Sequence, residues 1–228
     1  MKLYVFRHGQ TTHNLHGWHQ GWGPIGLTEL GFEQAAKTRE LIDGIRFDAV
    51  YASDLLRARQ TAEVIFPDWY REGRIHFDEN LREIDTGAFY KMTRDDLYKR
   101  YGFGEAYDQH RRMMDYAPFG AEGSAAVLAR ARAFLDEMEV LAPKSAKAVD
   151  LEGANPLAVS AADGPEKIAV VTHGGIVRAL ATCIAGMPEG TQLGHIPLLI
   201  SNCSVSVFSY NSKSGWLIEQ LNYTGGLK

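Results

Sequence analysis

The chain has 228 residues, 45% hydrophobic and 23% charged, so it can bury a substantial core without disulfides or metals. A formal net charge of −4 excludes a broadly basic surface for nucleic acid, and no apolar run approaches the ~20 residues of a membrane span. The N-terminal apolar stretch 3–6 is too short for a secretory signal. We therefore expect a cytoplasmic protein without nucleic-acid or membrane partners, in which Cys183 and Cys203 stay reduced.

The first third of the chain predicts two strands and two helices. The strands are 3–6 and 48–52, and the helices are 29–42 and 55–65. Thr28 is a typical N-cap for the first helix, and Pro67 is expected to end the second. The segment 9–26 is rich in glycine and polar residues, which predicts a loop.

The rest of the chain predicts three helices and three strands. The helices are 93–101, 125–141 and 175–185, and the strands are 168–172, 204–209 and 216–220. Residues 143–166 are rich in Ala, Ser, Gly and Pro, which is typical of a surface insertion. Strands alternate with helices over most of the chain, which favours one domain, 1–228, built as a three-layer α/β/α sandwich with a mainly parallel sheet.

Two of the predicted strands end in a histidine followed by glycine, namely His8 and His173. Parallel sheets bind ligands at the carboxyl ends of their strands, so both imidazoles are expected at one edge. A neutral imidazole is a nucleophile at physiological pH, and Arg7 adds a permanent charge with a planar donor fork. A helix that begins near Gly175 can direct its N-terminal N–H groups to the same anion. This pattern indicates phosphoryl chemistry.

Five segments carry further motifs: 7–14 (RHGQTTHN), 27–35 (LTELGFEQA), 53–62 (SDLLRARQTA), 81–87 (LREIDTG) and 170–175 (VVTHGG). In order and spacing they resemble the histidine phosphatase superfamily, the phosphoglycerate-mutase-like group. The resemblance covers most of the chain and implies the α/β fold of that group.

The resemblance also implies a mechanism. His8 would take the phosphoryl group as phosphohistidine, and Glu83 would protonate the leaving oxygen and then activate water. No metal and no cofactor would be needed, because cationic side chains hold the phosphoryl oxygens. The catalytic residues implied are Arg7, His8, Arg57, Glu83 and His173; the phosphate- or substrate-binding residues are Arg7, Asn14, Gln20, Gly21, Arg57, His173 and Gly174.

Other residues compete for these roles. Asp85 and Glu122 are alternative carboxylates to Glu83. Arg59 lies on a different helical face from Arg57, which favours a solvated charge.

Four histidines, at positions 8, 13, 16 and 19, share the first loop and invite a metal-site interpretation. Their segment has no cysteine or carboxylate at ligand spacing, so a solvated loop is the better interpretation for the last three.

The match departs from the family pattern near the expected substrate contacts. Gln20-Gly21 is kept, flanked by Trp18 and Trp22, but Pro24 and Gly26 stand where the family often has Asp and Pro. Residues 88–91 (AFYK) and 120–124 (GAEGS) also differ from common family endings. These departures leave catalysis intact and the substrate open. Candidate pocket residues, for which packing is the simpler role, are Tyr90, Tyr116, Phe119 and His195.

The residues after the acid separate two activities. Sugar-phosphate mutases of the family follow the acid with an Arg-His-Tyr-Gly type of sequence, whereas Glu83 is followed by Ile-Asp-Thr-Gly, which is similar to the phosphatase branch. We therefore expect a metal-independent phosphomonoesterase that acts on small phosphorylated metabolites. The alternatives are a cofactor-dependent phosphoglycerate mutase-type phosphotransferase and a catalytically silent phospho-ligand binding module. The expected partners are a small phosphorylated substrate or inorganic phosphate, with a homodimer left open.

Overall fold

The computed structural model of the chain describes residues 1–101, 115–143, 165–188, 190–191, 193 and 198–225. Nearly all of the expected insertion 143–166 lies outside these residues, as does His195. None of the helices in the described ranges is long and apolar enough to cross a membrane. Cys183 and Cys203 are both free thiols.

Six strands form one sheet in the order β3-β2-β4-β1-β5-β6. The strands are β1 Lys2–Arg7, β2 Ala49–Ala52, β3 Ile75–Phe77, β4 Lys167–Thr172, β5 Val205–Asn211 and β6 Gly215–Tyr223. The first four are parallel, and β5 is antiparallel to both β1 and β6. Because Arg7 pairs with Thr172 in the register of β1 and β4, the chain leaves two neighbouring strands at His8 and His173.

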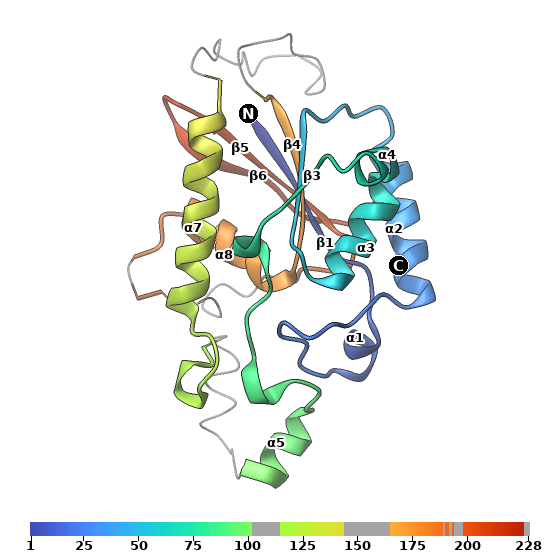
Figure 1. Cartoon of the computed structure of the whole chain (residues 1–228). Coiled ribbons are helices and arrows are strands. Elements are labelled where there is room, and N and C mark those ends of the chain that lie inside the picture. The colour runs from blue at the N-terminus through green and yellow to red at the C-terminus, as the bar shows by residue number, and fades with distance from the viewer. Residues whose placement is uncertain (102–114, 144–164, 189, 192, 194–197, 226–228) are drawn as a thin grey trace.

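Helices cover both faces of this sheet, with α2, α3 and α4 on one side and α7 and α8 on the other (Figure 1). The helices are α1 Thr12–His16, α2 Glu29–Leu41, α3 Leu56–Ile65, α4 Pro67–Arg71, α5 Arg94–Tyr101, α7 Ser124–Leu141 and α8 Gly174–Ile184. Successive side chains of a strand point to opposite faces, so Leu3 and Val5 join the core under α7 and α8, while Tyr4 and Phe6 join the core under α2 and α3. The predicted three-layer, mainly parallel architecture is confirmed.

The local predictions were wrong in two places. The expected loop 9–26 contains α1, because Thr11 and Asn14 form a capping box in which each side chain bonds the backbone of the other. The helix expected over 55–65 is confirmed as α3, which ends at Ile65; Pro67 then opens the separate helix α4 at a position where its missing N–H costs nothing. Strand β3 was missed because three residues are too few to show an alternating pattern.

Candidate active site

The two strand-end histidines lie side by side. Their ring centroids are 5.1 Å apart, and neither side chain is more than 1% exposed. The backbone N–H of His8 donates to the carbonyl of Thr172 at 2.9 Å, which continues the pairing of β1 with β4 beyond the strands. The sheet register therefore sets the separation of the two rings.

The ring of His8 is oriented by its own neighbour in sequence. Nδ1 lies 2.7 Å from the carbonyl oxygen of Gly9. A carbonyl oxygen only accepts, so Nδ1 carries the proton and Nε2 keeps its lone pair. Burial, together with the charges of Arg57 and Arg7, lowers the pKa of His8 well below its ordinary value. His8 is thus a neutral imidazole whose Nε2 can act as a nucleophile.

His173 presents its other ring nitrogen. Nε2 lies 2.8 Å from Oγ of Ser53, and the buried Nδ1 has no hydrogen-bond partner among the described residues. Burial, then the charge of Arg57, lowers the pKa of His173 well below its ordinary value. A dianionic phosphoryl group would shift this equilibrium back toward the imidazolium, because an opposite charge favours the charged form.

Two buried guanidinium groups flank the histidines. Arg57, in the first turn of α3, is fully buried and donates from Nη2 to the carbonyl of Gly21 at 2.9 Å and from Nη1 to that of Gly23 at 3.4 Å. Burial lowers the pKa of Arg57 to about 10, which leaves it charged at neutral pH. Arg7 donates from Nη1 to the carbonyl of Ile200. In the described part of the chain, Nε of each arginine is buried without a partner and is free to bind an anion.

Glu83 lies against the start of α8. Its Oε1 accepts from the backbone N–H of Gly175 at 3.1 Å and from that of Ile84 at 2.9 Å. A carboxylate at a helix N-terminus interacts favourably with the helix dipole. A Cβ on Gly175 would lie 2.2 Å from Oε1, so this contact requires glycine. The negative charge of Glu83 opposes the lowering of the pKa of both Arg7 and Arg57, which places the carboxylate within range of both.

The alternative residues have other partners. Glu122 forms a two-point ion pair with Arg130, at 2.8 Å for each bond, and Asp85 accepts from the backbone N–H of Gly87 at 2.9 Å. The guanidinium of Arg59 stacks over the ring of Phe77 at 4.1 Å. Of the three carboxylates considered, Glu83 is the one held at the start of α8.

Asn14 and Gln20 support the site through their neighbours. Oδ1 of Asn14 accepts from the N–H of Thr11 at 3.1 Å and from Nδ2 of Asn202 at 3.2 Å, so its amide NH₂ is the group left to donate. Gln20 Oε1 accepts from Oγ1 of Thr11 at 3.0 Å. A Cβ on Gly174 would make an ordinary contact, 3.5 Å from Nε of Arg7, so a phosphate-binding role for Gly174 stays a prediction.

Residues 21–23, which we call the bridge loop, connect the two sides of the site. The carbonyls of Gly21 and Gly23 accept from Arg57, while Nε1 of Trp22 between them donates to the carbonyl of Glu83 at 2.7 Å. Gly21 has φ +45°, a conformation that favours glycine, and a Cβ there would lie 2.6 Å from Oγ1 of Thr86. The bridge loop therefore contacts both the guanidinium of Arg57 and the backbone of Glu83.

Aromatic side chains pack around α1 beside this site. His13 stacks on Tyr90 with centroids 5.5 Å apart, and His16 stacks on Trp18 at 4.7 Å. Further aromatic pairs place Tyr116 and Phe119 against Phe89. Within the described ranges, no three His, Cys, Asp or Glu side chains converge to hold a metal ion.

Three supporting residues were not predicted from the sequence. Ser53 bonds His173, and Nδ2 of Asn202 donates to the carbonyl of His8 at 3.0 Å. Arg130 bonds the carbonyls before Glu83. Only Ser53 lay in a recognised motif, and nothing in the pattern around Asn202 or Arg130 distinguished them from surface residues.

Comparison with known proteins agrees with this geometry. The sequence model of the histidine phosphatase superfamily (branch 1) matches residues 3–151 and 152–224. A 2,3-bisphosphoglycerate-dependent phosphoglycerate mutase of Methylorubrum extorquens (strain PA1) is 28% identical over 192 residues, 83% of this chain and 81% of that protein. An adenosylcobalamin/alpha-ribazole phosphatase of Escherichia coli (strain K12) is 28% identical over 189 residues, 82% of this chain and 81% of that protein. The crystal structure of the alpha-ribazole phosphatase from Shigella flexneri gives a TM-score of 0.76 at 26% identity, covering 98% of this chain and 97% of that one.

The sheet and its strand-end histidines define a phosphoglycerate-mutase-like α/β protein. The chain belongs to the histidine phosphatase superfamily, branch 1, which confirms the family expected from the motifs. Its relatives include both mutases and phosphatases.

Proposed function

We propose that this chain is a metal-independent phosphomonoesterase that acts on small phosphorylated metabolites through a phosphohistidine at His8. The observation that carries the proposal is the tautomer of His8: the bond from Nδ1 to Gly9 leaves Nε2 unprotonated in a buried, cationic site. The nearby Nε groups of Arg7 and Arg57 and Nδ1 of His173 are the donors available for phosphoryl oxygens.

The first step transfers the phosphoryl group to the protein. The lone pair of His8 Nε2 forms the P–N bond as the P–O bond to the leaving group breaks. Protonated Glu83 gives its proton to the departing oxygen, and the arginines stabilise the charge on the phosphoryl oxygens. Water then attacks phosphorus, Glu83 takes a proton from it, and the P–N bond breaks to release inorganic phosphate and neutral His8.

Hydrolysis is favoured over mutase chemistry by the residues that follow the acid. The Ile-Asp-Thr-Gly sequence after Glu83 is similar to the phosphatase branch and differs from the Arg-His-Tyr-Gly type of the mutases. A mutase would return the phosphoryl group to a second position of its substrate. We further propose that the enzyme works in the cytoplasm; whether it forms a homodimer stays a prediction.

The test is turnover of p-nitrophenyl phosphate with a metal chelator present, in the wild type and in His8→Ala. The wild type should release phosphate and His8→Ala should lose about 10⁴-fold or more, as expected when a nucleophile is removed. Acid-labile, base-stable phosphoprotein should form in rapid-quench samples of the wild type only. His76→Ala, an exposed histidine on β3, is the matched control and should retain activity.

Activity that needs a metal, or that survives His8→Ala, would contradict the proposal. Phosphate binding without turnover of any phosphomonoester would instead support the silent binding module. Phosphate transfer between positions of a phosphoglycerate, without net release, would support the mutase alternative.

A further inference from the structure

The backbone that precedes the acid is held by one side chain of α7. A short 3₁₀ turn, Glu79–Leu81, ends two residues before Glu83, and carbonyls at the end of a helical turn lack internal partners. Arg130 donates hydrogen bonds to these carbonyls. Its Nη1 donates to the carbonyl of Asn80 at 2.8 Å and to that of Arg82 at 2.9 Å, and its Nη2 donates to the carbonyl of Glu83 at 3.4 Å.

Arg130 is itself fixed by Glu122. Nε and Nη2 each bond one carboxylate oxygen at 2.8 Å, and the two side chains are only 17% and 12% exposed. Glu122 also bonds Asp85 through two contacts of 3.0 Å, one from its backbone N–H and one to its carboxylate. Two-point arginine–carboxylate pairs have a defined geometry as well as a strong attraction. The pair thus ties the chain on both sides of Glu83.

We propose that Arg130, locked by Glu122, is a positioning residue that keeps the carboxyl group of Glu83 in place for proton transfer. This inference rests on the proposed function. The only side-chain bonds of Glu83 in the described residues go to the N–H groups of Ile84 and Gly175, so its reach depends on where its backbone is held. A misplacement of ~1 Å at a reacting group can lower the rate by about 10²-fold.

A positioning role for the acid has a signature that general destabilisation lacks. A leaving group that is already stable as an anion, such as p-nitrophenolate, needs little help from an acid, whereas a basic one such as phenolate needs a proton. The value of kcat/KM reports the first step, in which that bond breaks. Loss of acid placement should therefore make kcat/KM depend more steeply on the pKa of the leaving group.

The experiment measures kcat/KM for a series of substituted phenyl phosphates in Arg130→Met. Phenyl phosphate should lose about 30- to 100-fold, less than the about 10²–10⁴-fold of removing a positioned acid, because the acid is displaced and not removed; p-nitrophenyl phosphate should lose less than about 3-fold. Glu83→Gln should show the same steepening. Arg132→Met is the matched control, because Arg132 lies on the same helix and bonds the carbonyl of Cys183 instead.

Arg130→Lys and Glu122→Gln retain polar contacts and guard against a misfolded variant; each should show a smaller steepening while melting close to the wild type. An equal loss on every phenyl phosphate, or an unchanged slope, would overturn the positioning role while leaving the proposed function standing. A wild type that turns over none of the series would overturn the proposed function, and this inference with it.

Discussion

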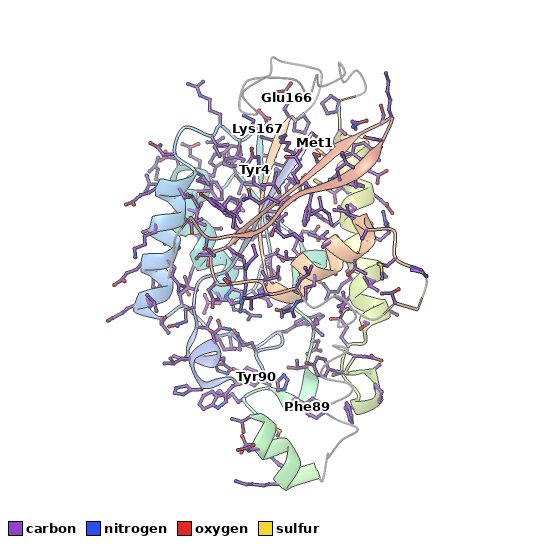
Figure 2. The ribbon with its side chains drawn as sticks, turned by 180° about the vertical axis from the view of Figure 1, so that it is seen from behind. Met1, Tyr4, Phe89, Tyr90, Glu166 and Lys167 are labelled. Atoms are coloured by element: carbon purple, nitrogen blue, oxygen red, sulfur yellow. The ribbon has the colours of Figure 1, made fainter. Side chains whose placement is uncertain are left out.

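The two ends of the sheet differ in whether their polar groups have hydrogen-bond partners. At the amino end, the N-terminal ammonium of Met1 donates to the carbonyl of Tyr210 at 3.0 Å, and Asp48 accepts from the backbone N–H groups of Glu166 and Lys167 at 2.9 Å each. Figure 2 shows Met1, Glu166 and Lys167 together at this end, and Phe89 and Tyr90 far away beyond the other. At the amino end, charged groups therefore form hydrogen bonds with backbone groups of the same chain.

The carboxyl end leaves buried polar atoms without partners. Within the described ranges, all six such side-chain atoms belong to residues at or next to this end: Arg7 Nε, His13 Nε2, Arg57 Nε, Thr86 Oγ1, His173 Nδ1 and Ser204 Oγ. An unpaired buried polar group costs about 1–3 kcal/mol of folding stability. None of these atoms in the described ranges lies at the amino end, and such a concentration at the carboxyl end is what we expect of an end that binds a ligand.

Among the tests of this contrast between the two ends, the largest expected effect comes from removing the buried arginine. Arg57→Met should lower kcat/KM by about 10³-fold, because it removes a donor from the phosphoryl oxygens in a water-poor site. Arg59→Met, two residues along the same helix, and Lys2→Ala at the amino end should each change it less than about 2-fold, because both are partly exposed charges whose partners lie outside the proposed site. Steady-state kinetics with a melting curve for each variant makes the measurement. A loss in Lys2→Ala as large as in Arg57→Met would break the contrast between the two ends.

A second prediction compares two neighbouring glycines at the carboxyl end, Gly174 and Gly175. Gly175→Ala should lower kcat/KM by about 10²-fold, because its Cβ would displace the carboxylate of Glu83 by an ångström or more. Gly174→Ala introduces only an ordinary contact and should lose less than about 5-fold, while gaining helix propensity. Kinetics on phenyl phosphate compares the two. If Gly174→Ala is the more damaging, Gly174 binds phosphate directly.

The smallest effect concerns pH and stability. His8 and His173 have lowered pKa values in the fold, so below their ordinary value near 6.5 the unfolded chain binds more protons than the folded chain. The free energy of unfolding should therefore fall as the pH drops below about 6.5, by up to about 1.4 kcal/mol per pH unit for each histidine. Urea unfolding between pH 5 and 8 measures the slope, and His173→Gln should reduce it. A stability that rises on acidification through this window would contradict neutral, buried histidines.

The sequence was sufficient to predict the candidate catalytic side chains. His8 and His173 follow strands that are visible as apolar runs, and Arg57 and Glu83 lie in motifs of fixed spacing. The structure brings these together at the expected edge. Their catalytic roles remain predictions.

Two of the unpredicted supports, Arg130 and Asn202, could not be found in the sequence because they hold the site through backbone carbonyls. Arg130 bonds three carbonyls and Asn202 bonds one. Every residue has a backbone carbonyl, so the sequence does not show which carbonyls will be hydrogen-bond partners. Helix α1 was missed for a related reason: a five-residue helix is too short to be stable alone and depends on the surrounding fold. What could not be predicted is therefore the part of the site that depends on where distant segments of main chain meet.

The bridge loop has a consequence for engineering new substrate preferences. One three-residue segment carries a contact to Glu83 between two contacts to Arg57, so a library randomised at 21–23 would disturb the proposed acid and the proposed phosphate donor at once. Most members of such a library would be inactive on every substrate, and selection would return the starting sequence. Diversity is better placed at Ala88 and Lys91, which are exposed and lie where the chain departs from common family endings, because Phe89 between them is buried in the core.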